Sequence, residues 1–395
     1  MFLISSFLWS LTKEERIKNF EKLYKSVKEQ FPFFEMRNIE WDEIYKKYRY
    51  IIQSSLDSID DEEYISILRD MLAGLDDGHA DIIKPPFNLI GIGAFITLKE
   101  NRVIVDYVEK GSPAENRGLK KGYEITGVNG SSVSNYINSL PIYFKKPQWK
   151  LRVLFFHGKA NISISLTLKD MDNTIKTIEV KRLIKEKKPV ENKIIYKFLD
   201  DEIGYIRISA FSGKNIIKEF DEALKDLFRS KGLIIDVRGN PGGSSEISDW
   251  IVGRFIEYKI KIGTSAYKMP KYIPSEGFKN VFNYIIKPRG KTYKKPVVIL
   301  IDFWCASACE LFTISMRDSG RAILVGRKTS GIMGLPGFIK LSGGILARFS
   351  TGDFIRLNGE SVEGRGITSD IQVDNEDEDI EKAIEILKLK ISKIK

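Results

Sequence analysis

One stretch constrains the fold more than any other, because it joins a buried strand directly to a helix. Residues 296–302 read Pro-Val-Val-Ile-Leu-Ile-Asp, a short apolar run typical of a buried strand. Cys305-Ala-Ser-Ala-Cys-Glu310 comes next, and apolar residues then lead to Arg317-Asp-Ser-Gly320, a basic turn with glycine at the end of a helix. Ser307 is therefore predicted to lie where the strand gives way to a helix N-terminus.

A serine at that junction has two interpretations. Backbone N–H groups at a helix N-terminus have no partner within the helix, and the helix dipole is positive there. An oxyanion formed beside Ser307 would therefore be stabilised, which favours a nucleophile. The alternative is a serine that only caps the helix.

The two cysteines of the chain, Cys305 and Cys309, both flank this serine. They stand four residues apart across a helix start, where a bond between them would be strained. We therefore expect them to pack as small buried side chains. A cysteine nucleophile is the alternative, although nothing in the sequence marks either thiol as activated.

Length and composition limit the class of protein. The 395 residues suggest two or three domains, and 43% hydrophobic with 29% charged residues indicates a globular chain. The net charge of +10 comes from scattered lysines, without zinc-ligand spacing or a compact arginine patch. We therefore expect no nucleic-acid partner, no metal and no organic cofactor. Membrane association and oligomeric state are left open by the sequence.

No segment reaches the eighteen or more apolar residues of a membrane span. The apolar run Met1–Ser10 lacks a basic leader, so we expect it to pack at the start of the first helix in a cytoplasmic protein. If the run is instead the remnant of a trimmed export signal, the protein is exported or lies at the cell surface.

Helical patterns fill residues 12–75 and end at the turn Leu75-Asp-Asp-Gly-His79. The chain has two histidines, His79 and His157. His157 resembles a structural residue at a strand end, whereas His79 lies on a helix-to-loop turn of the kind that carries function. If Ser307 needs a general base near neutral pH, His79 is the best candidate, and a satisfied structural histidine is the alternative.

Strand patterns follow from about residue 88 to 182. Gly91-Ile-Gly-Ala-Phe-Ile96, the helix start in Gly111-Ser-Pro-Ala-Glu-Asn-Arg-Gly-Leu119, and Ile125-Thr-Gly-Val-Asn-Gly130 stand in the order of a PDZ domain, which this region resembles. PDZ domains bind chain ends by adding the peptide as a strand, with its carboxylate among backbone amides. The matching amides are predicted at Ile92, Gly93 and Ala94. A structural PDZ fold with an unused groove is the alternative.

Strand, helix and strand patterns then alternate, which is typical of an α/β domain. Two strands joined at Asp200-Asp201 precede a helix over residues 216–227 and a buried strand at Gly232–Arg238. Gly239-Asn-Pro-Gly-Gly-Ser244 follows, a turn that permits positive φ and close backbone approach. If the turn is functional, the backbone amide of Gly242 or Gly243 would donate a hydrogen bond to an oxyanion. The alternative is that it is only a tight turn.

Three further elements are predicted downstream. A helix is expected over residues 250–257, and an irregular surface segment, with a lid near the site as one interpretation, over residues 268–295. A hairpin is expected over residues 338–350.

The ordered set of motifs resembles the tail-specific, or C-terminal processing, peptidases (S41-like), a family that includes the tricorn core protease. The resemblance covers nearly the whole chain. It implies that Ser307 is the nucleophile, since it stands at the centre of a motif whose outer serines are here Cys305 and Cys309. One branch pairs serine with a lysine, but Ile332 occupies that position here, and Lys328 is interpreted as a surface lysine.

The tricorn-like branch uses serine, histidine and an acidic residue instead. The resemblance implies that His79 is its histidine and Glu363 its acid, with Glu360 as the nearest rival. In this arrangement the histidine takes the hydroxyl proton, the glutamate orients the imidazole, and amides of a glycine and Ala308 hold the oxyanion.

The sequence therefore predicts a multi-domain α/β protein. Its expected parts are an N-terminal helical region (1–85), a PDZ-like β-rich domain (86–182) and an α/β catalytic domain of ClpP/crotonase-like character (183–395). The predicted function is that of a serine peptidase acting on proteins or peptides, with a PDZ-like domain that binds substrate C-termini. The alternative is a catalytically inactive ligand- or peptide-binding protein on the same scaffold.

Overall fold

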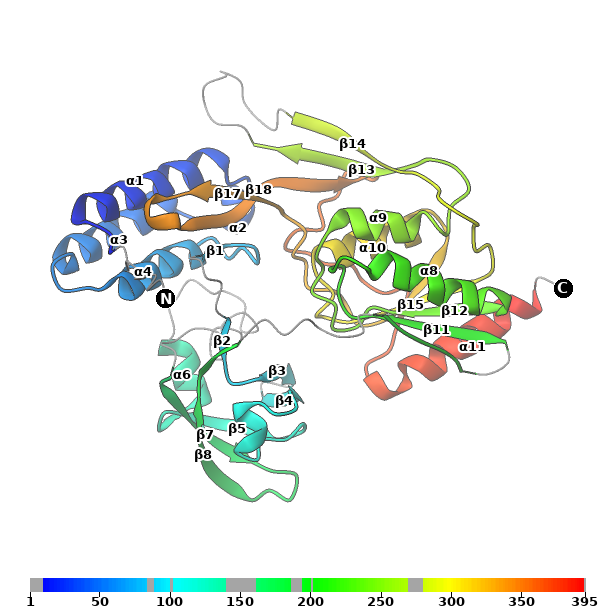
Figure 1. Cartoon of the computed structure of the whole chain (residues 1–395), viewed down its shortest axis with the longest axis horizontal. Helices are drawn as coiled ribbons and strands as arrows, with labels where there is room; N and C mark the ends of the chain where they lie inside the picture. The colour runs from blue at the N-terminus through cyan, green and yellow to red at the C-terminus, as the bar shows by residue number, and fades with distance from the viewer. Residues whose placement is uncertain are drawn as a thin grey trace, which may run out of the picture. The chain divides into compact units, whose positions relative to one another are not determined.

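The computed structural model describes residues 10–83, 89–99, 102–139, 161–185, 194–199, 202–268 and 280–393 (Figure 1). The apolar run at residues 1–9 and His157 lie outside the described residues. The chain forms two compact units, each described by itself below. Unit 1 comprises Met1–Lys28, Phe33–Pro189 and Phe338–Phe349, and unit 2 comprises Glu29–Pro32, Val190–Gly337 and Ser350–Lys395. The domain boundaries at 85 and 182 stay predictions.

Unit 1 begins with helices, as the apolar spacing predicts. Thr12 and Glu15 form the capping pair that starts the first helix: the Glu15 amide donates to Thr12 Oγ1 at 3.1 Å, and the Thr12 amide donates to Glu15 Oε2 at 2.9 Å. The helices are α1 (Lys13–Gln30), α2 (Phe34–Arg37), α3 (Trp41–Ser55) and α4 (Asp61–Ala73). Their apolar faces are buried through Phe20, Leu23, Val27, Trp41, Tyr48, Ile52, Tyr64, Leu68 and Leu72.

The second part of unit 1 is an antiparallel sheet in the order β3-β4-β5-β7-β8, with β6 paired to β5. Ser112 caps the short helix α5 by accepting the Glu115 amide at 3.1 Å, with Pro113 in the first turn, so the predicted Ser-Pro-Ala helix start is confirmed. The elements are β3 (Ala94–Lys99), β4 (Arg102–Val108), α5 (Pro113–Asn116), β5 (Glu124–Val128), β6 (Ser131–Ser132), α6 (Val133–Ser139), β7 (Ser163–Lys169) and β8 (Ile175–Lys181). A separate pair joins β2 (Leu89–Gly91) to β9 (Leu183–Lys185).

The predicted hairpin near residue 340 is confirmed, with β17 (Leu335–Lys340) paired to β18 (Leu346–Arg356). In unit 1, the first residues of β18 pair antiparallel with β1 (Asp81–Ile83). In unit 2, its later residues pair with β13 (Ile260–Tyr267), which in turn pairs with β14 (Asn280–Ile286). The prediction of an irregular segment over 268–295 was therefore wrong for residues 280–286.

Unit 2 is built on a sheet in the order β10-β11-β12-β15-β16-β19, parallel from β11 onward. Its strands are β10 (Ile194–Phe198), β11 (Ile203–Ile208), β12 (Gly232–Asp236), β15 (Val297–Ile301), β16 (Ala322–Gly326) and β19 (Ile371–Gln372). Its α-helices are α8 (Ile216–Asp226), α9 (Ser245–Val252), α10 (Ala308–Asp318) and α11 (Asp379–Ser392). The helix predicted at 250–257 was placed too late, because Ser244 caps α9.

Helices cover both faces of this sheet, α8, α9 and α10 on one face and α11 on the other (Figure 1). Alternate strand residues supply the two cores: Leu233 and Ile235 pack with the three helices, and Ile234 packs with α11. The predicted multi-domain α/β class is confirmed. None of the helices in the described part of the chain combines the length and the apolar character that crossing a membrane requires.

Candidate active site

Ser307 lies between the end of β15 and the start of α10, as the sequence predicts. Its φ of 55° and ψ of −121° differ from the extended backbone of an ordinary helix-capping residue. Within the stretch Cys305–Glu310, Ser307 is partly exposed and the other five residues are buried. The turn therefore presents this one side chain, in a conformation that costs about 1–3 kcal/mol for a residue other than glycine.

Hydrogen bonds from two other segments of unit 2 hold the turn in this conformation. The Ser307 amide donates to the Ile332 carbonyl at 2.8 Å, and the Ala306 amide donates to the Asn240 carbonyl at 3.2 Å. Asp302, directly after β15, accepts the amides of Gly239 and Trp304, each at 3.0 Å. Burial raises the pKa of Asp302 to about 6.

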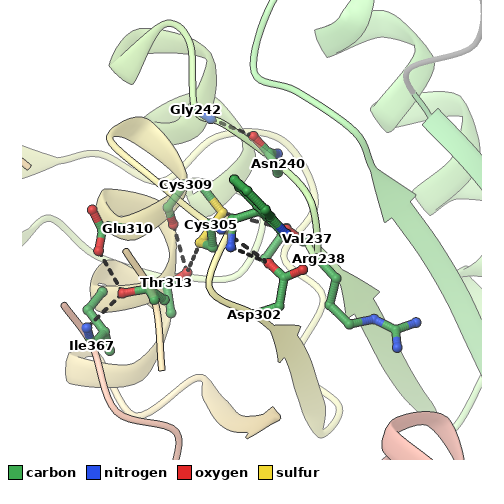
Figure 2. The surroundings of a disulfide bond; sticks show 12 residues. Val237, Arg238, Asn240, Gly242, Asp302, Cys305, Cys309, Glu310, Thr313 and Ile367 are labelled. Atoms are coloured by element: carbon green, nitrogen blue, oxygen red, sulfur yellow. Dashed lines mark hydrogen bonds between the residues drawn. A yellow bond between two sulfur atoms is a disulfide. The ribbon is translucent and has the colours of Figure 1, made fainter. Parts of the chain in front are cut away.

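Cys305 and Cys309 form a disulfide, so the prediction that they do not bond to each other was wrong (Figure 2). The bend at Ser307 brings their Cα atoms to 5.4 Å, within the range that a disulfide spans. The Thr313 hydroxyl, one turn further along α10, donates to the Cys309 carbonyl at 2.7 Å. The bond excludes either cysteine as a thiolate nucleophile while it is formed.

The glycine turn after β12 packs directly against Ser307. Gly242 has φ 96°, and a Cβ atom there would lie 2.5 Å from the Ala306 carbonyl oxygen and 2.9 Å from Ser307 Cβ. A Cβ atom on Gly243, with φ 136°, would lie 2.2 Å from the Phe211 carbonyl oxygen. Both positions therefore require glycine, for lack of space as well as for backbone conformation.

The two glycines differ in what their amides bind. The Gly242 amide donates to Asn240 Oδ1 at 2.8 Å, so it already has an acceptor (Figure 2). Neither Gly243 nor Ala308 gives its amide to an acceptor among the described residues, and Ala308 is the first residue of α10. Of the three amides predicted to hold an oxyanion, these two remain available.

Glu363 is buried, with 1% of its surface exposed. Its Oε2 accepts the amides of Met333 at 2.6 Å and Gly334 at 2.5 Å. The rival carboxylate, Glu360, is exposed and accepts from Asn358 Nδ2 at 2.7 Å. Of the two carboxylates, Glu363 is thus bound to the segment whose Ile332 carbonyl accepts from Ser307.

Glu310 is a residue that the sequence analysis left without a role. It is completely buried and accepts hydrogen bonds from Thr329 Oγ1 at 2.6 Å and from the amides of Gly331 and Ile332 at 2.8 Å each. The Ser307 amide lies 3.3 Å from its Oε2. Burial raises the pKa of Glu310 to about 7. The available signal was a lone carboxylate in the first turn of an otherwise apolar helix.

His79 belongs to unit 1 and is buried, with 8% of its surface exposed. Its amide donates to Asp77 Oδ1 at 3.0 Å, its Nδ1 lies 4.0 Å from the same oxygen, and its carbonyl accepts from Arg348 Nε at 2.8 Å. Burial lowers the pKa of His79, so its imidazole is neutral at pH 7. The pairing of His79 with Ser307 stays a prediction.

The two residues that bear on a lysine partner for Ser307, Ile332 and Lys328, both belong to unit 2. Ile332, at the place of the lysine in the other branch, is buried, and Lys328 is exposed as the sequence predicts.

Among the described residues, no three His, Cys, Asp or Glu side chains gather in a way that would hold a metal ion.

The predicted peptide-binding amides lie at the bend before β3. Ile92 and Ala94 are buried, and Gly93 has φ 78°, with Ser112 packed so closely that a Cβ atom would lie 2.3 Å from Ser112 Cβ. Among the described strands β3 pairs only with β4, so it forms an edge of its sheet. Peptide binding at these residues stays a prediction.

Three segments of the chain match models of known protein families. Residues 202–373 match the model of peptidase family S41, residues 12–73 match the Tricorn protease C1 domain, and residues 82–146 match the PDZ domain. The chain is 26% identical over 351 residues to carboxy-terminal processing protease CtpA of Bacillus subtilis, which covers 85% of this chain and 69% of that protein. It is 25% identical over 367 residues to CtpB of the same organism, which covers 86% of this chain and 69% of CtpB.

Solved structures share the fold at lower identity. Mature CPAF complexed with lactacystin matches with a TM-score of 0.72 at 15% identity, covering 95% of this chain and 98% of that one. The photosystem II D1 C-terminal processing protease matches with a TM-score of 0.56 at 20% identity, covering 95% of this chain and 97% of that one. The match of residues 202–373 to peptidase family S41, with segments similar to the Tricorn C1 and PDZ domains before it, identifies the chain as a serine-type peptidase.

Proposed function

We propose that this peptidase cleaves protein or peptide substrates with Ser307 as its nucleophile and His79 as the general base. The two Bacillus subtilis relatives are named as carboxy-terminal processing proteases, which supports processing near chain ends as its activity. The proposal follows the tricorn-like arrangement of serine, histidine and glutamate.

One observation carries the proposal. Ser307 is the partly exposed residue of a buried turn, it has a positive φ, and the amides of Gly243 and Ala308 have no acceptor among the described residues. Ser307 also forms a capping box with Glu310 at the start of α10, but capping alone would need neither the left-handed backbone nor the close approach of Gly242.

In the proposed reaction His79 removes the Ser307 hydroxyl proton as the oxygen attacks the substrate carbonyl carbon. The resulting oxyanion accepts hydrogen bonds from the amides of Gly243 and Ala308, and the histidine then donates its proton to the leaving amine. Water releases the acyl group by the same steps in reverse order. A histidine whose pKa is lowered by burial starts this cycle in the neutral form that a base requires.

Glu363 and Gly243 are assigned their roles in this scheme on different observations. Glu363 is the proposed acidic partner of the histidine, supported by its burial and by its bonds to the segment next to Ser307. The oxyanion donor from the glycine turn is assigned to Gly243, because the Gly242 amide already donates to Asn240.

The PDZ domain is proposed to hold the carboxyl end of the substrate. The edge position of β3 leaves a place where an extended peptide adds as a strand, and the left-handed bend at Gly93 lies at the start of that strand. A substrate whose carboxyl end is amidated should then show a raised KM with a similar kcat. Equal KM values for free and amidated ends would contradict this role.

A fluorophosphonate probe with mass mapping tests the catalytic assignment. Wild-type protein should be labelled at Ser307, and both Ser307→Ala and His79→Ala should lose the label. His157→Ala replaces the other histidine of the chain and serves as the matched control, with labelling expected to persist.

Each unexpected result of the labelling experiment would overturn a different assignment. Labelling at Ser307 that survives His79→Ala would place the base elsewhere, and Lys328→Ala would be the next variant. Absence of labelling in folded wild-type protein would overturn Ser307 as the nucleophile.

A further inference from the structure

We propose that Glu310 is a positioning residue for the nucleophile, and that its ionised carboxylate joins the Ser307 turn to the segment 329–332. This inference rests on the proposed role of Ser307. Glu310 touches no reacting atom in this scheme and acts through the backbone that it holds.

The donors around Glu310 fix the direction of every hydrogen bond. Backbone amides can only donate, which settles the bonds from Ser307, Gly331 and Ile332. Thr329 Oγ1 accepts the Ile367 amide at 2.7 Å and directs its own proton to Glu310 Oε1 at 2.6 Å. Four donors therefore point at one carboxyl group, and only the ionised form can accept from all four.

The bonds connect directly to the nucleophile. Ile332 gives its amide to Glu310 Oε2 at 2.8 Å and receives the Ser307 amide at its carbonyl, also at 2.8 Å. The Ser307 turn and residue 332 are thus held to the same carboxylate from two sides. Losing one of these bonds lets the turn relax toward an ordinary backbone, because the φ of 55° is maintained by its surroundings.

A second carboxylate continues the arrangement along the chain. Glu310 accepts the amides of Gly331 and Ile332, and Glu363 accepts those of Met333 and Gly334. Four consecutive amides are therefore bound by two buried glutamates. Through this segment Glu310 also supports the position of the proposed acidic partner.

Protonation of Glu310 should be visible in the pH dependence of catalysis. The groups that face it are a hydroxyl and three amides, and they offset part of the burial that raises its pKa to about 7. The charged groups of the packed segments are otherwise engaged or exposed: Arg327 pairs with Asp379, Lys328 and Arg365 are exposed, and Glu363 binds amides.

As pH falls through about 7, Glu310 takes up a proton and at least one of its four donors loses its acceptor. The rate of acylation should then fall near pH 7. The pKa of His79 is lowered, so a loss caused by His79 would begin only below the ordinary histidine range. Glu310→Gln separates the two groups, because it removes the titration of Glu310 and keeps that of His79.

The test is the rate of fluorophosphonate labelling at Ser307 from pH 5 to 9, together with kcat and KM for a peptide substrate. In wild-type protein the labelling rate should fall as pH is lowered, with a midpoint near pH 7; this fall is the acid limb of the profile. Glu310→Gln should lower the labelling rate on the order of 100-fold with little change in KM, and should lose that limb. Glu310→Asp keeps a carboxylate and should recover part of the rate and the limb. Glu385→Gln, at an exposed carboxylate of α11, is the control and should match wild type.

Thr329→Val provides a second test that does not depend on the folding of the glutamine variant. The Thr329 hydroxyl donates to Glu310 and thereby lowers the pKa of that carboxyl group. Removing the hydroxyl should raise this pKa and move the acid limb to higher pH, and Thr329→Ser should move the limb back. A Glu310→Gln profile identical to wild type, or a limb unmoved in Thr329→Val, would overturn the inference. Failure of wild-type protein to label at Ser307 would instead overturn the proposed function.

Discussion

The turn that holds Ser307, the proposed nucleophile, depends on a residue with no role in the proposed chemistry. Gly242 lies so close to the turn that any added carbon would contact the Ala306 carbonyl oxygen, Ser307 Cβ and the Ala308 amide nitrogen. The left-handed backbone at Ser307 therefore requires the absence of a side chain at Gly242, and a change to either residue should move the Ser307 hydroxyl relative to the proposed oxyanion donors.

Gly242→Ala should accordingly lower kcat/KM by about 100-fold or more, because a displacement of about 1 Å at the reacting group has an effect of that size. Gly320→Ala is a matched control: Gly320 also has a positive φ, 73°, but has no atom within 4 Å of its Cβ position. It should lose about 1 kcal/mol of stability with kcat/KM within about twofold of wild type. Equal kcat/KM losses in the two variants would contradict the role of close packing.

At this scale the sequence predicted the place of Ser307 but not its environment. The strand and helix patterns around it are local, so they locate the junction. Its positive φ, the bonds from the Gly331 and Ile332 amides to Glu310, and the bond from the Ala306 amide to the Asn240 carbonyl depend on segments distant in sequence, and periodicity carries no information about them.

The start of α10 is also held by the disulfide between Cys305 and Cys309. A bond that closes so short a loop removes entropy from the unfolded chain worth about 2 kcal/mol, so Cys305→Ser/Cys309→Ser should unfold several degrees below wild type. Differential scanning calorimetry measures this. Reductant should lower the unfolding temperature of wild type by a similar amount and leave the double variant unchanged; an equal response of both proteins would show that the bond does not contribute.

Elements were predicted well where a single pattern is enclosed by clear end signals, as for β10, β11, α8 and β12. Helix α9 was misplaced because the glycine turn before it concealed the cap at Ser244. Strand β14 was missed because its pairing with β13 is nonlocal, and few of its residues are buried. The disulfide was missed for the related reason that the bend at Ser307 brings its two residues together.

For the whole molecule, burial raises the pKa of several carboxyl groups. The values are about 6 for Asp70 and Asp302 and about 7 for Asp249 and Glu310. In the unfolded chain these groups release their protons near pH 4. Between pH 4 and 7 the folded protein thus binds more protons than the unfolded chain, and the free energy of unfolding should fall as pH rises.

Two buried groups, Asp236 and His79, act in the opposite direction. The pKa of Asp236 is lowered despite its burial, through hydrogen bonds and charge from Arg238, so its contribution is lost only as pH falls below its ordinary value. The pKa of His79 is lowered by burial, so the unfolded chain binds a proton first below about pH 6.5.

The four carboxyl groups outweigh this one histidine. Urea unfolding should therefore give a midpoint at pH 5 above that at pH 7, with the unfolding free energy larger by about 1 kcal/mol or more. A midpoint that rises from pH 5 to pH 7 would contradict the prediction. Stability and activity should thus change in opposite directions across this range, since ionised Glu310 is proposed to favour catalysis.

The order of helical, PDZ-like and α/β segments was predictable from the sequence because each has its own periodicity. The pairing of His79 with Ser307 stays a prediction, because the two residues belong to different compact units and no pattern within either unit specifies it.

The four amides from Gly331 to Gly334 lie in a segment without helix or strand, yet each donates to a buried carboxylate. In deuterated solvent such a segment should exchange its amide protons as slowly as a strand in the centre of a sheet. Its rate of deuterium uptake then reports the state of Glu310 and Glu363 without any substrate. Slow exchange in residues 331–334 would thus indicate that the turn holds Ser307 in the proposed catalytic conformation. Loss of the bonds to the two glutamates would appear as faster exchange before the whole protein unfolds.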